Sequence, residues 1–109
     1  MFRGSTPTLP IEIVGVDLTG AKLFLTIKSR TDGSKFTLVS PGDFDVEYDS
    51  ANNKTFGDIT LTQEQTLKLK AGLCDAQIRY VFPDGAADAT LMACVTVNDI
   101  LMKDVIAYE

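Results

Sequence analysis

The stretch LTQEQTLKLKAG (residues 61–72) decides how this chain folds, because it alone carries helical signals among strand-like runs. Thr62 and Gln65 have the spacing of a capping box, in which each side chain accepts a hydrogen bond from the other residue's backbone amide. Gly72 supplies a residue that tolerates the left-handed backbone at the end of such a turn. The pattern predicts a short capped helix between two strands, and it carries no catalytic group.

Turn signals divide the rest of the chain into short alternating runs, which is the spacing typical of an all-β sandwich or barrel. The expected strands are 8–16, 21–29, 35–40, 43–49, 54–61, 73–82 and 89–97. Pro10 marks the first strand as an edge or bent strand, and Gly57 indicates a bulge in the fifth. The residues expected on the core faces of the sixth and seventh strands are Ala76, Ile78, Tyr80 and Phe82, then Leu91, Ala93, Val95 and Val97.

These runs predict an all-β fold, an antiparallel immunoglobulin-like β-sandwich of about seven strands with one short capped helix between strands five and six. A partly open barrel with the same strand order is the alternative. With 109 residues the chain forms one domain, 1–109, with an N-terminal arm (1–7) and a C-terminal tail (98–109). The tail mixes polar and apolar residues, so we expect it to pack on the body or on a neighbour.

Composition excludes several kinds of function. The net charge of −5 and pI near 4.6 argue against nucleic-acid binding, which needs clustered Lys and Arg. The chain has no histidine, the commonest general base and metal ligand. The start of the sequence lacks the apolar core of a signal peptide, and no apolar run has membrane-spanning length. We therefore expect a cytosolic protein at first, with no membrane contact, no cofactor and no metal.

The cysteines and the acidic residues are read as structural. Cys74 and Cys94 fall on strands six and seven, with side chains expected on opposite faces, so a disulfide is not predicted. Alternating carboxylates on the fourth strand are interpreted as a solvated face that discourages edge pairing, with contact to a basic partner or Ca²⁺ as the alternatives. This acidic row consists of Asp43, Asp45, Glu47 and Asp49. No catalytic residue is predicted.

Several short motifs resemble a family of small proteins from prophages of Gram-positive bacteria. The motifs are RGSTPT (3–8), DLTGA (17–21), the 61–72 stretch, AQIRY (76–80) with PDG (83–85), and the ending VNDIL (97–101) with Val105 and Ile106. The likeness spans nearly the whole chain, although each motif alone is short and structural. Cys74 departs from the family's usual valine or small residue. The family's pattern is similar to the N-terminal sandwich of phage baseplate upper proteins.

The resemblance implies a non-enzymatic phage structural or assembly protein of the tail or baseplate, which is made in the host cytoplasm and then enters the virion. Its partners would be other tail or baseplate subunits, with a homo-oligomer also open. Short termini beside a compact sandwich can add strands to a neighbour's edge, so the arm and tail are the predicted contacts. The predicted partner-binding residues are Arg3, Thr6, Pro7, Ile100, Leu101, Val105 and Ile106. The alternative is a free-standing adhesion or ligand-binding module that uses its turns at Asp32-Gly33 or Asp84-Gly85.

Overall fold

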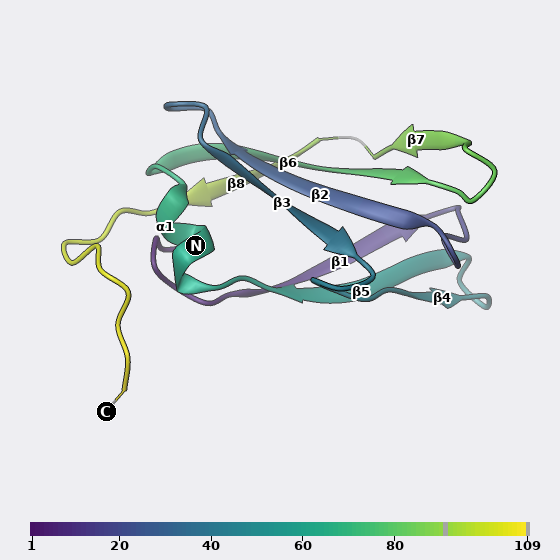
Figure 1. Ribbon diagram of the computed structural model, residues 1–109, viewed down its shortest axis with the longest axis horizontal. Helices are drawn as coiled ribbons and strands as arrows, with labels where there is room; N and C mark the ends of the chain where they lie inside the picture. The colour runs from purple at the N-terminus through teal and green to yellow at the C-terminus, as the bar shows by residue number, and fades with distance from the viewer. Residues whose placement is uncertain (91, 109) are drawn as a thin grey trace.

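The computed structural model describes residues 1–90 and 92–108, which form two packed β-sheets with one short helix (Figure 1). The elements in chain order are β1 (Thr8–Val14), β2 (Lys22–Ser29), β3 (Lys35–Ser40), β4 (Glu47–Asp49), β5 (Lys54–Thr60), α1 (Gln63–Lys68), β6 (Gly72–Val81), β7 (Ala87–Ala89) and β8 (Ala93–Val97). The predicted all-β fold and the helix between strands five and six are confirmed. Residues 1–90 and 92–108 contain eight strands, one more than predicted, because β7 and β8 stand in place of the single strand predicted at 89–97.

The two sheets have the strand order of an immunoglobulin-like sandwich. One sheet has the order β1-β5-β4, and the other has β3-β2-β6, with β7 and β8 both paired to β6. All of these pairings are antiparallel. The order corresponds to strands B, E and D of the immunoglobulin fold packed on C′, C, F and G. Separate sheets exclude the open-barrel alternative.

Alternating side chains build the core between the sheets. On β2, Leu23, Leu25 and Ile27 are buried, while Lys22 and Lys28 on the opposite face are exposed. On β6 the predicted inward face is confirmed: Ile78 and Tyr80 are buried, and Ala76 and Phe82 pack against the core. Because side chains alternate along a strand, each strand presents one apolar face to the opposite sheet.

The predicted strand 89–97 is divided by a one-residue shift in its pairing with β6. Arg79 pairs with Ala89, but Ala76 pairs with Ala93. The paired residues are therefore three positions apart on β6 and four positions apart on the segment opposite. A one-residue shift in register changes which side chains of a segment face inward. Val97 is buried and Val95 half-buried as predicted, whereas Ala93 is exposed. Leu91 lies outside the described residues.

The predicted strand 43–49 shortens to β4 because its first part forms a turn. The Asp43 carboxylate accepts a hydrogen bond from the Val39 amide at 2.9 Å, and the Asp43 amide donates to the Val39 carbonyl. At the other end, the Asp49 carboxylate accepts from the amides of Ala51 and Asn52. Asp45 and Glu47 are exposed. The acidic row is therefore not a flat strand face, because two of its members bind backbone amides in turns.

The bulge predicted at Gly57 is wrong, since β1 and β5 pair without interruption from Thr8–Thr60 to Val14–Lys54. A glycine is needed here for a different reason. The Asp45 carbonyl and Val46 pass directly over the Gly57 Cα, so a Cβ there would collide with the Asp45 carbonyl oxygen. Gly57 thus allows the segment before β4 to lie close against β5.

Replacing Gly57 by alanine should lower the free energy of unfolding by about 1–3 kcal/mol, because the colliding atom is backbone and the strand must shift to admit a methyl group. Equilibrium unfolding in urea measures this loss. Asp58→Ala, at the neighbouring exposed position of β5, is the matched control and should change stability by less than about 0.5 kcal/mol. Equal stability of Gly57→Ala and the control would contradict the steric argument.

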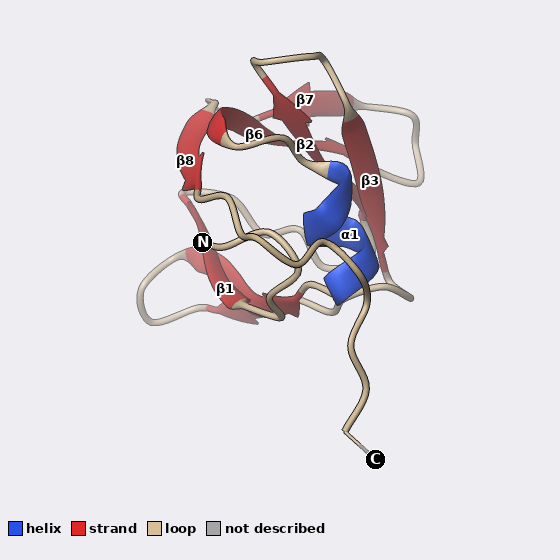
Figure 2. Cartoon of the chain, turned by 90° about the vertical axis from the view of Figure 1, so that its left-hand side faces the viewer, coloured by secondary structure: helices blue, strands red, loops and turns tan. Residues whose placement is uncertain are grey.

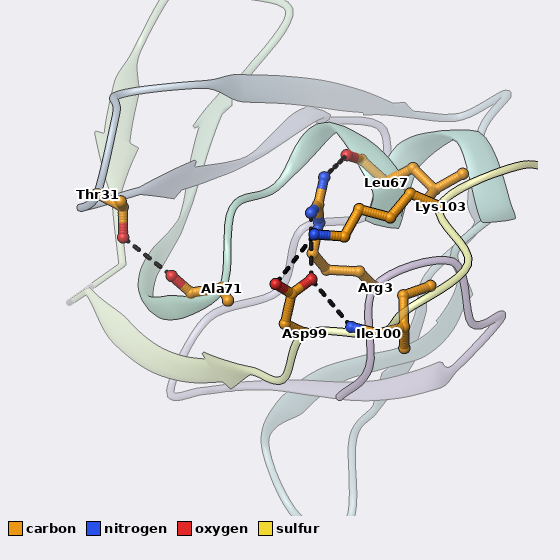
Figure 3. Close-up of polar contacts among 7 residues, drawn as sticks. All are labelled: Arg3, Thr31, Leu67, Ala71, Asp99, Ile100 and Lys103. Atoms are coloured by element: carbon orange, nitrogen blue, oxygen red, sulfur yellow. Dashed lines mark hydrogen bonds and ion pairs between the residues drawn. The ribbon is translucent and has the colours of Figure 1, made fainter.

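Helix α1 forms as the sequence predicts at its start and differs at its end. Thr62 is the N-cap, and the Thr62–Gln65 capping box is complete, with both hydrogen bonds formed. The helix ends at Leu69, whose backbone is extended, three residues before Gly72. Gly72 has the positive φ expected of it, +121°, but as the first residue of β6. A Cβ at Gly72 would stand 3.1 Å from the hydroxyl oxygen of Thr31, and that hydroxyl donates to the Ala71 carbonyl (Figure 3).

Candidate interaction site at the helical end of the sandwich

The N-terminal segment and the segment that follows β8 both lie beside α1 at one end of the sandwich (Figure 2). Phe2 forms a parallel β-bridge with Asn98, and the Arg3 amide donates to the Asn98 carbonyl at 3.0 Å. Residues 1–7 are therefore not an extended arm in this structure, because they fold back beside the segment that follows β8. The 61–72 stretch, the first residues and the start of the tail form one packed unit.

Arg3 joins the three parts of this unit (Figure 3). Its side chain is buried, with the residue only 8% exposed, and Nη2 donates to the Leu67 carbonyl at 2.9 Å. Nη1 pairs with Asp99 Oδ1 at 3.3 Å. The last turn of a helix leaves carbonyls without helical partners, and a guanidinium supplies both a donor and a positive charge there. Arg3, a predicted partner-binding residue, contacts its own chain on all these sides.

Asp99 is the second centre of the unit, since its carboxylate receives three donors. Oδ1 accepts from the Ile100 amide at 2.9 Å and from Arg3, while Oδ2 accepts from the Lys103 ammonium at 3.0 Å. The Ile100 amide, followed by Lys103 and Arg3, holds the pKa of Asp99 below its ordinary value. The ionised form is therefore the one that the folded end stabilises.

This lowered pKa predicts a pH dependence with a definite sign. The stabilisation by Asp99 should be fully present above the ordinary carboxyl pKa and should be lost as pH falls through the lower folded-state pKa of Asp99. Asp99→Asn should melt below the wild type at neutral pH, and the difference in melting temperature should shrink on acidification. Thermal melts of both proteins across this range measure it. A difference that stays constant down to about pH 2 would contradict the assignment.

The remaining N-terminal residues contact α1 and the strand before it. The Ser5 carbonyl accepts from the buried Thr66 hydroxyl at 2.8 Å, and the Pro7 carbonyl accepts from the Leu61 amide at 3.0 Å. Gly4 has φ +74°, and a Cβ there would stand 3.2 Å from Ile100 Cδ1. Ile100 is accordingly half-buried over the N-terminal segment. Among the predicted contacts in this segment, Thr6 is exposed and Pro7 is half-buried.

Beyond Ile100 the chain trace of the tail leaves the body of the sandwich (Figure 1). Its exposed large apolar residues are Leu101, Met102, Val105, Ile106 and Tyr108. Gln63 contacts this segment: its Nε2 donates to the Ile106 carbonyl, and its Oε1 accepts from the Ile106 amide, both at 2.8 Å. Val105 lines a groove of about 480 Å³ with Thr6, Thr60, Leu61, Thr62, Gln63 and Glu64. The structure thus brings Thr6 close to Val105, both predicted site residues.

The cysteines occupy opposite faces of the second sheet, as predicted. Cys74 is buried and pairs in register with Val95, while Cys94 is exposed opposite Asp75. Burial raises the pKa of the Cys74 thiol. In the described ranges, 1–90 and 92–108, no group of three or more metal-ligating side chains is assembled. No helix in those ranges is long and apolar enough to cross a membrane.

Comparisons with known proteins give a distant structural similarity. No protein-family model matches the sequence, and a search of curated proteins finds no match. Among solved structures, the chain is similar to AggA, the major subunit of aggregative adherence fimbriae type I from Escherichia coli. Sequence identity is 12%, and the alignment covers 89% of this chain and 84% of the fimbrial subunit, with a TM-score of 0.47. A similarity at this distance transfers neither a function nor a partner to this chain.

Proposed function

We propose that this chain is a non-enzymatic structural or assembly protein of a phage particle, a tail or baseplate component that acts through protein–protein contacts at its helical end. The observation that carries the proposal is the group of large apolar side chains left in solvent on the tail at residues 101–108. Contiguous exposed apolar side chains on a soluble domain mark an interaction surface. Phe2, which is also exposed, lies at the same end, where it forms a β-bridge with Asn98.

The prophage assignment rests on the resemblance of the motifs. Three of these motifs, 3–8, 61–72 and 97–101, are far apart in the sequence and supply Arg3, Leu67 and Asp99. Arg3 bonds to both of the other two at the helical end. Three family motifs that meet in one packed unit are what a shared attachment mode would produce. It supports a common role for this end of the molecule.

Particle association tests the proposed function. The gene's bacterial host is treated to induce its prophages, particles are purified on a density gradient, and an antibody against this chain locates it by immunogold electron microscopy. We expect the protein to sediment with particles and to label the tail or baseplate. A protein that stays at the top of the gradient, in a lysate full of intact particles, would refute the assignment.

The alternative, an adhesion or ligand-binding module, would place the contacts on the turns after β2 and β6. In those turns the Asp32 carboxylate accepts from the Ser34 amide and hydroxyl, and the Asp84 carboxylate accepts from the Ala86 amide. Both carboxylates therefore stabilise their own turns. The apolar tail favours the first proposal.

A further inference from the structure

The tail is held by a contact that recognises backbone and not a particular side chain. A residue in an extended chain presents its N–H and C=O toward the same neighbour, as in a β-ladder. The Gln63 amide group satisfies both groups of Ile106, donating through Nε2 and accepting through Oε1 at 2.8 Å. The side-chain amide of Gln63 thus takes the place of a neighbouring strand's backbone and binds the tail at Ile106.

The side chains of this segment are only partly accommodated by the chain's own surface. Val105 lies in the groove beside Gln63, yet it remains 55% exposed, and Ile106 remains 58% exposed. Leu101 and Tyr108 project fully into solvent. Apolar area left in water is a driving force for association, at roughly 25 cal/mol per Å² that a partner covers. The docked tail therefore offers further apolar area to a second surface.

The segment between the two anchored points is exposed and is held by the exposed Lys103–Asp99 ion pair. Ile100 is fixed over Gly4, and Ile106 is fixed on Gln63, while residues 101–104 are exposed. The Lys103 ammonium binds Asp99, which lies on the anchored side of this segment. Five residue steps from Ile100 to Val105 can span about 17 Å when extended, enough to cross to an adjoining molecule.

We propose that two copies of this chain exchange their tails, with Val105 and Ile106 of each copy bound in the groove and on the Gln63 amide of the other. The proposal deepens the proposed function, on which it rests, by naming the partner as a second copy. The groove already fits this segment, so exchange keeps the Val105 and Ile106 contacts described above. It gives up the exposed Lys103–Asp99 ion pair, and an exposed pair of this kind contributes little to stability. It also brings Leu101 and Met102 of both copies to the junction, where each covers apolar surface of the other.

Light scattering of the full chain over a wide concentration range tests the assembly. We expect a dimer for the wild type, with a dissociation constant raised at least about tenfold by Gln63→Ala, since each exchanged site loses two hydrogen bonds. Val105→Asp should have a similar effect, because it places a carboxylate in the groove beside Glu64. Lys68→Ala, an exposed position on the same helix, is the matched control and should dimerise like the wild type. Thermal melts verify that each variant is folded.

Mixing the two variants separates exchange from ordinary dimerisation. Gln63→Ala has a damaged site and an intact tail, whereas Val105→Asp has a damaged tail and an intact Gln63 amide. In an exchanged dimer the intact tail of Gln63→Ala binds the intact site of Val105→Asp. Native mass spectrometry of the mixture should therefore show a heterodimer at a concentration at which each variant alone is monomeric. A wild-type dimer with no such rescue would overturn exchange, as would a wild type that is monomeric at every concentration.

The two proposals fail in different ways. A monomeric chain that still sediments with phage particles would overturn tail exchange and leave the proposed function intact. An exchanged dimer that is absent from purified particles would do the reverse.

Discussion

Replacing Leu69 by alanine is expected to lower the free energy of unfolding by about 2–5 kcal/mol, the usual cost of removing a fully buried leucine side chain. Leu69 is completely buried at the point where α1 ends, and its amide donates to the Thr66 carbonyl at 3.3 Å. The truncated side chain leaves a cavity between the helix end and the sheets. Equilibrium unfolding in urea at neutral pH measures the loss.

Lys70→Ala is the matched control for Leu69→Ala, since it removes a long side chain from the adjacent exposed position. Its effect should stay within about 0.5 kcal/mol of zero. Should the two variants prove equally stable, 61–72 would be a peripheral connection, and its central place in the fold would be wrong.

Replacing Arg3 by alanine is expected to lower the free energy of unfolding by about 3 kcal/mol, because it removes charge-assisted hydrogen bonds and leaves the Leu67 carbonyl without this donor. The loss should also free Asp99 and with it the start of the tail. Hydrogen exchange should accordingly be faster at the backbone amides of positions 3 and 100. In the wild type these amides donate to the Asn98 carbonyl and to the Asp99 carboxylate, respectively. Urea unfolding and exchange together measure both effects.

Two substitutions bracket the Arg3 prediction. Arg3→Lys keeps the charge, but a single ammonium lacks the guanidinium fork that spans Leu67 and Asp99, so an intermediate loss is expected. Arg79→Ala removes an exposed arginine from β6 and should be nearly neutral. If Arg3→Ala matched Arg79→Ala, the N-terminal segment would contribute little to the fold.

Local chemistry explains what the sequence could predict. The Thr62–Gln65 capping box involves residues three positions apart, and strand faces follow from alternation every second residue, so both are visible in a short window. The Asp-Gly turn after β2 is similarly local. These features were enough for an immunoglobulin-like sandwich with one helix, and the structure confirms that fold.

Long-range contacts explain what the sequence could not predict. Arg3 bonds to residues 64 and 96 positions away, so no local pattern distinguishes a segment that binds its own chain from one that binds a neighbour. The one-residue shift in register between β7 and β8 depends on how these two strands align with β6. Gly57 is visible in the sequence as a glycine within a strand. The reason for it is the carbonyl of Asp45, which lies in the segment before β4.

In the candidate site, the sequence predicts the apolar residues of the tail but does not predict Gln63, the residue that binds it. Leu101, Val105 and Ile106 were visible as apolar residues in a mixed terminal segment. Gln63 looked like an ordinary exposed residue in the first turn of a helix, and its partner Ile106 lies 43 positions away. A side-chain amide that binds a distant backbone group produces no periodic pattern in the sequence, so this contact is visible only in the folded structure.

The edge formed by the two short strands β7 and β8 also limits edge-to-edge strand pairing between molecules of this chain. Those strands offer only three and five residues for pairing, β4 offers three, and Pro10 removes a donor from β1. Of the edges in the described ranges, β3 alone presents an uninterrupted run of six residues without proline. A filament needs two usable edges on the same sheet, one for each neighbour. Lateral growth through β3 would therefore stop at a single pair, and concentrated solutions of this chain should not form cross-β fibrils from the native state.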